Sequence, residues 1–134
     1  MITSAANAAW LDEASQLEKK DGDAAVFIVT QADPYFERAS GRSASATDGY
    51  AQFRQELLAH TLAFGKPVIL IHGDTHRYRV DHPLIDPATH KPVENFTRIE
   101  SFGSPFVDWI NVSVDPAGRK LLAINSGTEI KRTR

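Results

Sequence analysis

The stretch Pro67-Val68-Ile69-Leu70-Ile71 decides the fold of this chain, because its apolar residues run together with no polar residue to mark an exposed face. Unbroken runs of this length that contain β-branched residues are typical of strands buried on both faces of a parallel sheet. A second run of this kind, Ala24-Ala25-Val26-Phe27-Ile28-Val29, lies upstream. The two runs predict two buried strands of a parallel sheet in an α/β protein.

A helix is predicted before the first run. Apolar residues recur there at about four-residue spacing, which favours one buried helical face: Ala6, Trp10, Ala14 and Leu17. Ser4 is suited to cap the N-terminus of this helix, and the Asp21-Gly22-Asp23 turn ends it. Trp10 is therefore interpreted as a core residue.

A second helix is predicted between the two apolar runs. Its apolar stripe has helical spacing: Tyr50, Phe53, Leu57, Thr61 and Phe64. Ser45 and Asp48 resemble a capping box at its start, and Gly65 followed by Lys66-Pro67 ends it. The polar segment 37–45, rich in small residues, is predicted to be a loop.

The C-terminal half has a different pattern. Prolines at positions 83, 87 and 92 exclude a regular element between His82 and Val93. Strands are predicted at 96–100, 109–114 and 120–124, and the turn 115–118 makes the last two an antiparallel hairpin. The predicted fold is therefore α/β, with a mixed sheet, helices on one side and an antiparallel C-terminal portion. Residues 1–124 are expected to form one domain, and residues 125–134 a tail.

Composition excludes several classes of protein. The 134 residues carry a formal net charge of −2, so the basic surface typical of a nucleic-acid-binding protein is not expected. No apolar run approaches the roughly 20 residues that cross a bilayer, and residues 1–7 do not read as a signal peptide. With no cysteine, the chain has neither disulfides nor thiolate chemistry. We expect a soluble, cytoplasmic protein that binds neither nucleic acid nor membrane.

Candidate site residues follow the two predicted parallel strands. Ligands of open α/β sheets bind outside the carboxyl ends of the strands, where this sequence places Asp33, His72, Asp74 and His76. If the strands are neighbours, these side chains converge on one edge of the sheet. Imidazole and carboxylate ligands together suit manganese, zinc or iron. The competing interpretation is a solvent-facing loop whose polar groups cap nearby backbone.

The segment Val68-Ile69-Leu70-Ile71-His72-Gly73-Asp74-Thr75-His76 resembles the last motif of the calcineurin-like metallophosphoesterases, an apolar strand followed by Gly-His-x-His. Residues 95–103 and 109–115 are similar to the strands that follow this motif in some bacterial members. The resemblance covers residues 8–124. It implies half of a four-layer αββα sandwich and a part in the metal-dependent hydrolysis of phosphoesters.

The resemblance also implies roles for single residues. His76 matches the second histidine of the motif and is expected to bind metal, and Asp74 stands where the first histidine is expected. The family has another metal-binding histidine after an earlier strand, where this chain has Gln31 and Asp33. The N-terminal family motifs (Asp-x-His, Gly-Asp and Gly-Asn-His-Asp/Glu) are absent from this sequence. Half of the site is therefore implied, with the catalytic residues unassigned.

Two functions remain open from the sequence. In the first, the chain takes part in phosphoester hydrolysis with a divalent metal (Mn, Zn or Fe), and Arg77 and Arg79 bind the phosphate of a small substrate. In the second, it is a non-catalytic module that binds or oligomerises. Half of a sandwich would leave apolar residues uncovered, such as Phe96, Phe102, Phe106 and Trp109, so we expect a homo-oligomer or a partner chain.

Overall fold

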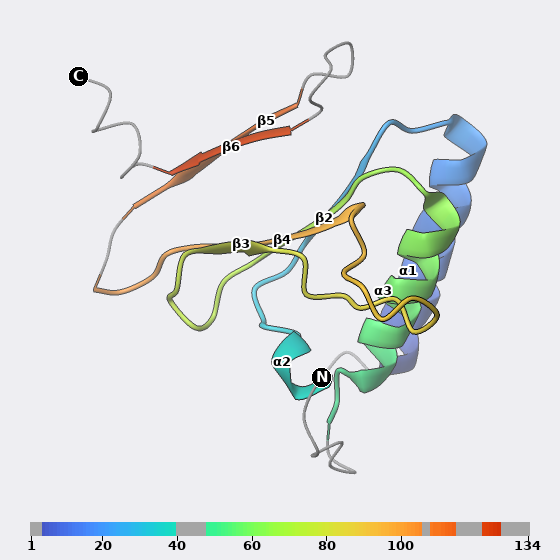
Figure 1. Ribbon diagram of the computed structural model, residues 1–134, viewed down its shortest axis with the longest axis horizontal. Helices are drawn as coiled ribbons and strands as arrows, with labels where there is room; N and C mark the ends of the chain where they lie inside the picture. Colours follow the sequence, from blue (N-terminus) through green and yellow to red (C-terminus); the bar gives the residue numbers. More distant parts are fainter. Residues whose placement is uncertain (1–3, 40–47, 106–107, 115–121, 127–134) are drawn as a thin grey trace.

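The computed structural model of this chain describes residues 4–39, 48–105, 108–114 and 122–126. It is an α/β protein with a mixed sheet (Figure 1). Its elements in chain order are α1 (Ser4–Asp21), β1 (Val26–Val29), α2 (Phe36–Ala39), α3 (Ala51–Phe64), β2 (Val68–His72), β3 (Arg79–Asp81), β4 (Phe96–Glu100), β5 (Ile110–Val114) and β6 (Leu122–Ser126).

The four-stranded sheet has the order β1-β2-β4-β3. Strands β1, β2 and β4 are parallel, and β3 pairs antiparallel with β4. The prediction that the two apolar runs form strands of a parallel sheet is confirmed, and the two strands, β1 and β2, are neighbours. Strand β2 is buried on both faces, as predicted, whereas that expectation is wrong for β1, where Phe27 and Val29 are 39% and 73% exposed. The predicted antiparallel hairpin is also confirmed as β5 and β6, although β6 ends at Ser126, two residues beyond its predicted end. The loop turn 115–118 and most of the predicted tail lie outside the described residues.

The helices pack on one face of the four-stranded sheet, as predicted. Apolar side chains from α1, α2 and α3 join those of β1, β2 and β4 in one buried cluster: Leu11, Phe36, Leu57, Ile28, Val68, Leu70 and Phe96. Phe96 is fully buried, so the expectation that it would be uncovered is wrong. Phe106 lies outside the described residues, while Trp109 is 51% exposed.

The predicted inner face of α1 is wrong. Trp10 and Leu17 are 56% and 53% exposed, whereas Leu11 and Ser15 are buried. Ser15 satisfies its hydroxyl by donating to the carbonyl of Leu11 at 2.8 Å, so a polar residue fits the buried face of the helix. The spacing of the large apolar residues in this segment therefore predicted the wrong face of the helix as the buried one.

Helix α3 begins later than predicted. It starts at Ala51 with Tyr50 as its N-cap residue, and Asp48 accepts the backbone N–H of Tyr50 and pairs with Arg54. Ser45, the other residue of the predicted capping box, lies outside the described residues. The predicted end is confirmed: Gly65 has φ 68°, and its N–H donates to the carbonyl of Thr61 at 3.2 Å. Helix α2 overlaps the start of segment 37–45, which was predicted to be a loop, and residues 40–47 lie outside the described part of the chain.

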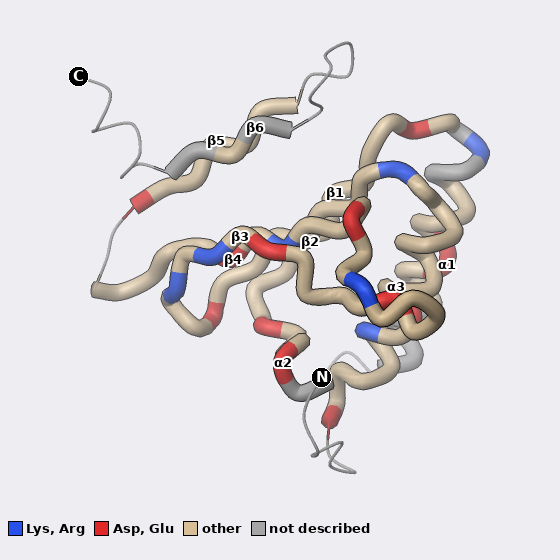
Figure 2. Tube along the Cα trace, in the orientation of Figure 1, with Lys and Arg blue, Asp and Glu red and all other residues tan. Residues whose placement is uncertain are grey.

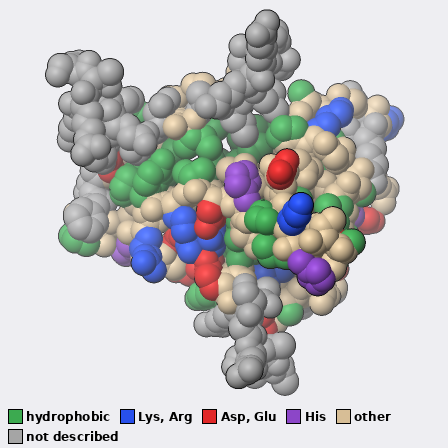
Figure 3. Space-filling model, viewed as in Figure 1, with side chains coloured by type: hydrophobic (Ala, Val, Ile, Leu, Met, Phe, Trp, Pro, Cys, Tyr) green, Lys and Arg blue, Asp and Glu red, His purple; other side chains and the backbone are tan. Residues whose placement is uncertain are grey.

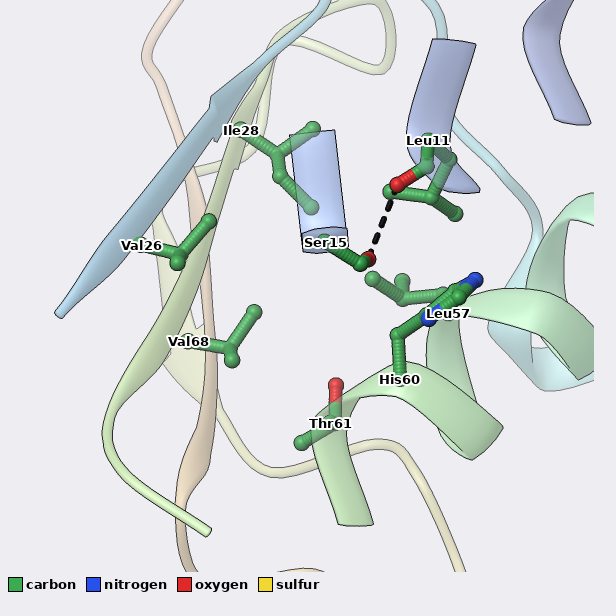
Figure 4. Close-up of a pocket in the computed structure, with 8 residues that line it drawn as sticks. All are labelled: Leu11, Ser15, Val26, Ile28, Leu57, His60, Thr61 and Val68. Carbon is green, nitrogen blue, oxygen red and sulfur yellow. Dashed lines mark hydrogen bonds between the residues drawn. The ribbon is translucent and has the colours of Figure 1, made fainter. Parts of the chain in front are cut away.

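A small pocket lies between α1, α3, β1 and β2 (Figure 4). Its lining is mostly aliphatic: Leu11, Ser15, Val26, Ile28, Leu57, His60, Thr61 and Val68. The Thr61 hydroxyl is buried there without a hydrogen-bond partner among the described residues. The pocket is a packing gap of the helix–sheet interface rather than a site with converging polar groups.

The other face of the sheet is covered at its centre and open at its margins. Ile69 and Ile99 are fully buried, but Val29 on β1 is 73% exposed and Val80 on β3 is 41% exposed. Figure 1 places the β5–β6 hairpin on the side of the sheet away from α2, and Figure 3 shows hydrophobic side chains gathered between that hairpin and the sheet. Among the described residues, no helix is long and apolar enough to cross a membrane.

Candidate functional site

The three parallel strands end side by side at one edge of the sheet. Beyond β2, the N–H of Gly73 donates to the carbonyl of Gln31, at 3.2 Å. Beyond β4, the N–H of Ser101 donates to the carbonyl of His72, at 2.9 Å. These two hydrogen bonds hold the loop after β2 beside the loop after β1, and the loop after β4 beside the end of β2. The edge is thus the place where ligands of open α/β sheets bind.

The loop after β2 has an unusual backbone. Asp74 and His76 have φ values of 83° and 61°, which residues other than glycine seldom adopt. Both side chains are exposed, and the Asp74 carboxylate has no hydrogen bond or ion pair within the described residues. Residues held in this region cost about 1–3 kcal/mol each and gather at functional sites. The conformation turns the loop sharply and presents both side chains to solvent.

The ring of His76 is held by a backbone acceptor. Its Nδ1 lies 2.8 Å from the carbonyl oxygen of Ser104, in the loop after β4. A carbonyl oxygen only accepts, so Nδ1 carries the proton of this hydrogen bond. In the neutral ring the lone pair is then on Nε2. Histidines that bind metal through Nε2 hold Nδ1–H in this way, on a carbonyl or a carboxylate.

His72 repeats this arrangement inside the protein. Only 2% of the residue is exposed, and its Nδ1 lies 2.9 Å from the carbonyl oxygen of Gly73. Its Nε2 is buried and finds no partner among the described residues. A buried polar atom without a hydrogen-bond partner costs about 1–3 kcal/mol, so Nε2 is the unusual feature of His72.

Asp33 has a structural role at the end of β1. The residue is 3% exposed, and its Oδ1 accepts the backbone N–H of Tyr35 at 2.8 Å. Tyr35 has φ 53°, so this aspartate stabilises a tight left-handed turn that leads into α2. Of the candidate metal ligands, Asp33 is the one whose carboxylate is already used by the backbone.

A cluster of five charged residues fills the other half of the edge, and the sequence analysis missed most of it. Arg79 pairs with Glu100 at 2.6 Å, Arg98 pairs with Asp81 at 2.5 Å, and both arginines contact Glu37 of α2. Arg98 and Glu100 are almost fully buried. Figure 2 shows the basic and acidic positions along β3 and β4, and Figure 3 shows basic and acidic side chains side by side on the surface.

The charged cluster lowers the pKa of Glu37. Partial burial by itself would raise the pKa of its carboxyl group. Hydrogen bonds from its own backbone and from Arg98, with the positive charges of Arg98 and Arg79, outweigh burial and hold the pKa below its usual value. The carboxylates Asp81 and Glu37 in turn raise the pKa of Arg98 against the opposing effect of its burial.

The sequence does contain a signal for this cluster. Arg79-Val80-Asp81 and Arg98-Ile99-Glu100 share a charged–apolar–charged pattern, and antiparallel pairing places Arg79 opposite Glu100 and Asp81 opposite Arg98. Opposite charges directly across an antiparallel pair are stabilising. This complementarity would have identified β3, which was not predicted as a strand.

The two predicted phosphate-binding arginines differ. Arg79 is engaged by Glu100 and Glu37, so its guanidinium is occupied. Arg77 is exposed, and it has no ion pair within the described part of the chain. Of the two, Arg77 is the guanidinium available to an anion.

The candidate metal ligands do not form a complete set. Within residues 4–39, 48–105, 108–114 and 122–126, no three His, Cys, Asp or Glu side chains are placed to share one metal ion. The structure brings His72, Asp74 and His76 to one edge through a single strand and its loop. No family model matches this chain, and no curated protein or solved structure matches it either. The molecule is therefore described by its class, an α/β protein with a mixed sheet. Two histidines that hydrogen-bond backbone carbonyls, His72 and His76, lie at the edge where its parallel strands end.

Proposed function

We propose that this chain contributes ligands to a divalent-metal centre of the phosphoesterase type, at the loop after β2. The observation that carries the proposal is the hydrogen bond from Nδ1–H of His76 to the Ser104 carbonyl. The ring is exposed, and its Nε2 keeps the lone pair that a metal ion would bind. The unengaged carboxylate of Asp74 stands two residues away in the same loop. Imidazole nitrogen with carboxylate oxygen suits manganese, zinc or iron.

The remaining ligands must come from outside the described residues, because this chain's described part holds no set of three. His72 is a further candidate, because its Nε2 has no hydrogen-bond partner within the described part of the chain, and the exposed Arg77 would attract a phosphoryl group. A divalent ion in such a centre would polarise a phosphoryl oxygen and lower the pKa of a bound water to about 7. The role of this chain would be to supply and orient ligands in a hydrolase completed by another segment or chain.

The first experiment measures metal bound to chelator-treated protein after incubation with manganese or zinc, by elemental mass spectrometry. His76→Asn removes the imidazole but tolerates the left-handed backbone. His90→Asn is the matched control, because His90 is also exposed and has φ 56°. We expect metal retention in the wild type and the control, and loss in His76→Asn. Equal retention in all three proteins, or in none, would refute the proposal.

A second candidate function is supported by a different observation, the open margin of the sheet at β1. This strand has one neighbour in the described sheet, and its outward residues Phe27 and Val29 are 39% and 73% exposed. Exposed apolar residues along an unpaired edge are typical of association surfaces. The candidate function is a non-catalytic module that assembles with a second copy of itself through β1.

Light scattering at micromolar concentration tests the second candidate. Val29→Lys places a charge on the β1 margin, and Val114→Lys places one on the β5–β6 hairpin, where Val114 is 47% exposed. Self-association that is lost in Val29→Lys and kept in Val114→Lys would support it. A wild-type protein that is monomeric throughout would contradict it.

A further inference from the structure

We propose that Gly103 and the carbonyl of Ser104 form a clamp that positions the His76 ring and selects its tautomer. The clamp lies in the loop after β4, whereas His76 lies in the loop after β2, so two separate connections meet at this ring. The inference deepens the proposed function and rests on it only for the final step, metal binding by Nε2. The clamp itself is proposed for the metal-free protein.

Gly103 is required by the ring rather than by its own backbone. A Cβ at this position would lie 2.3 Å from Cδ2, 2.5 Å from Cγ and 3.0 Å from Cβ of His76, far inside van der Waals contact. Its φ is not in the left-handed region, unlike Gly22 and Gly65, beside which a Cβ would meet nothing within 4 Å. The missing side chain of Gly103 is therefore the space that His76 occupies.

The Ser104 carbonyl supplies the second point of the clamp. The ring rests on Gly103 while its Nδ1–H donates to the next residue's carbonyl at 2.8 Å, so both ring plane and proton position are set. An exposed imidazole without such contacts samples several rotamers and both neutral tautomers. Holding one rotamer and one tautomer in advance lowers the entropy that metal binding must remove, which is how groups that hydrogen-bond a metal ligand strengthen metal sites.

The clamp predicts a specific consequence for Gly103→Ala. The ring must leave its place, the Nδ1 hydrogen bond is lost, and the neutral ring no longer has its proton confined to Nδ1. Removing the hydrogen-bond partner of a metal-binding histidine typically weakens metal affinity about 10–100-fold. We expect a loss in this range for zinc, with the fold of the four-stranded sheet unchanged.

The control substitution is Gly73→Ala, a glycine at the same edge of the sheet. Its added Cβ would lie 3.5 Å from Oγ of Ser101 and 3.7 Å from the carbonyl oxygen of Gln31, which are ordinary contacts. The pair therefore compares two glycine-to-alanine changes at one edge, of which one collides with His76. Any general effect of an extra methyl group in these loops will appear in both variants.

The experiment records the imidazole nitrogen-15 signals of His76 in the metal-free protein above neutral pH. The clamp predicts the Nδ1–H tautomer in the wild type and in Gly73→Ala, and a shift toward the mixed tautomers of a free side chain in Gly103→Ala. A wild-type ring that carries its proton on Nε2 would overturn the inference, even if Gly103→Ala cannot be purified. Unchanged signals in Gly103→Ala would overturn it as well.

A stability cycle gives a second measurement. Gly103→Ala should lower the unfolding midpoint in the wild-type background and have little effect in a His76→Ala background, because the colliding ring is gone. Equal effects in the two backgrounds would overturn the clamp. Zinc titrations then separate the two proposals: tautomer selection without wild-type metal binding supports the clamp and refutes the proposed function, whereas metal binding indifferent to Gly103→Ala refutes the clamp alone.

Discussion

Replacing Arg79 with alanine should expose the dependence of the fold on the charged cluster. Arg79 donates to Oε2 of Glu100 through Nε at 2.9 Å and through Nη2 at 2.6 Å, and the Glu100 side chain is fully buried. After Arg79→Ala, the only remaining partner of this carboxylate among the contacts that the structure describes is the Thr75 hydroxyl. The variant therefore leaves a buried charge with one neutral donor.

The expected cost follows from this burial. Breaking a buried ion pair by removing one partner typically costs about 3–5 kcal/mol. Arg79 itself is 28% exposed, so its removal admits water to the carboxylate and favours the lower value, about 3 kcal/mol. For a chain of 134 residues this corresponds to a drop in unfolding temperature on the order of 12 °C. Urea and thermal unfolding followed by circular dichroism measure both quantities.

Two further variants make the test strict. Arg77→Ala removes an exposed arginine two positions away and should change the free energy of unfolding by no more than about 0.5 kcal/mol. Adding Glu100→Gln to Arg79→Ala removes the stranded charge and should recover at least about 1 kcal/mol. If Arg79→Ala were as mild as Arg77→Ala, or if Glu100→Gln deepened the loss, the reasoning from buried charge would be refuted.

Three other predictions follow from the structure. Leu57→Ala, in a side chain that is 1% exposed, should cost about 2–5 kcal/mol in urea unfolding; a cost near zero would contradict its place in the core. Gly65→Ala should cost about 1 kcal/mol by the same measurement, because φ is 68° there, while Gly49→Ala, with open space around it, should cost less. The lowered pKa of Glu37 contributes stability that is present above the usual pKa of 4.5 and is lost as the pH falls through the lower folded value. Glu37→Gln should therefore flatten the loss of stability between about pH 5 and 3, by less than about 1 kcal/mol because the carboxylate is 53% exposed, and an unchanged pH profile would contradict this.

The elements that could be predicted from sequence are those with a local signal. The apolar runs predicted β1 and β2 as strands, although only β2 is buried on both faces, and Gly65 predicted the end of α3 because a left-handed glycine is a common helix terminus. The face of α1 could not be predicted in the same way. Ser15 is buried because its hydroxyl bonds back to Leu11, while Trp10 is exposed, so hydrophobicity alone ranks these residues in the wrong order.

The sequence predicted where the candidate site lies, but not which hydrogen bonds its residues make. The rule that ligands bind beyond parallel strands placed His72, Asp74 and His76 at one edge. No sequence pattern shows that Asp33 is used by the Tyr35 backbone or that the Ser104 carbonyl accepts from His76. Those contacts depend on loops from different strands meeting, which is a property of the sheet order rather than of any local segment.

The edge of the sheet is divided between two tasks, and this division favours a ligand site at the β2 loop over a purely structural one. On the β3–β4 side every buried charge has an opposite charge, and Glu37 of α2 ties both arginines together, as expected of groups that hold a fold. On the β2 side, Asp74 and His76 have left-handed backbone, and Nε2 of His72 has no hydrogen-bond partner among the described residues. Among the described residues, Thr61 and Glu56 also have a buried side-chain oxygen without a partner, so what distinguishes the β2 loop is that such an atom lies next to left-handed backbone at Asp74 and His76. His72, Asp74 and His76 are therefore the groups to test first for a ligand that lies beyond this chain's described residues.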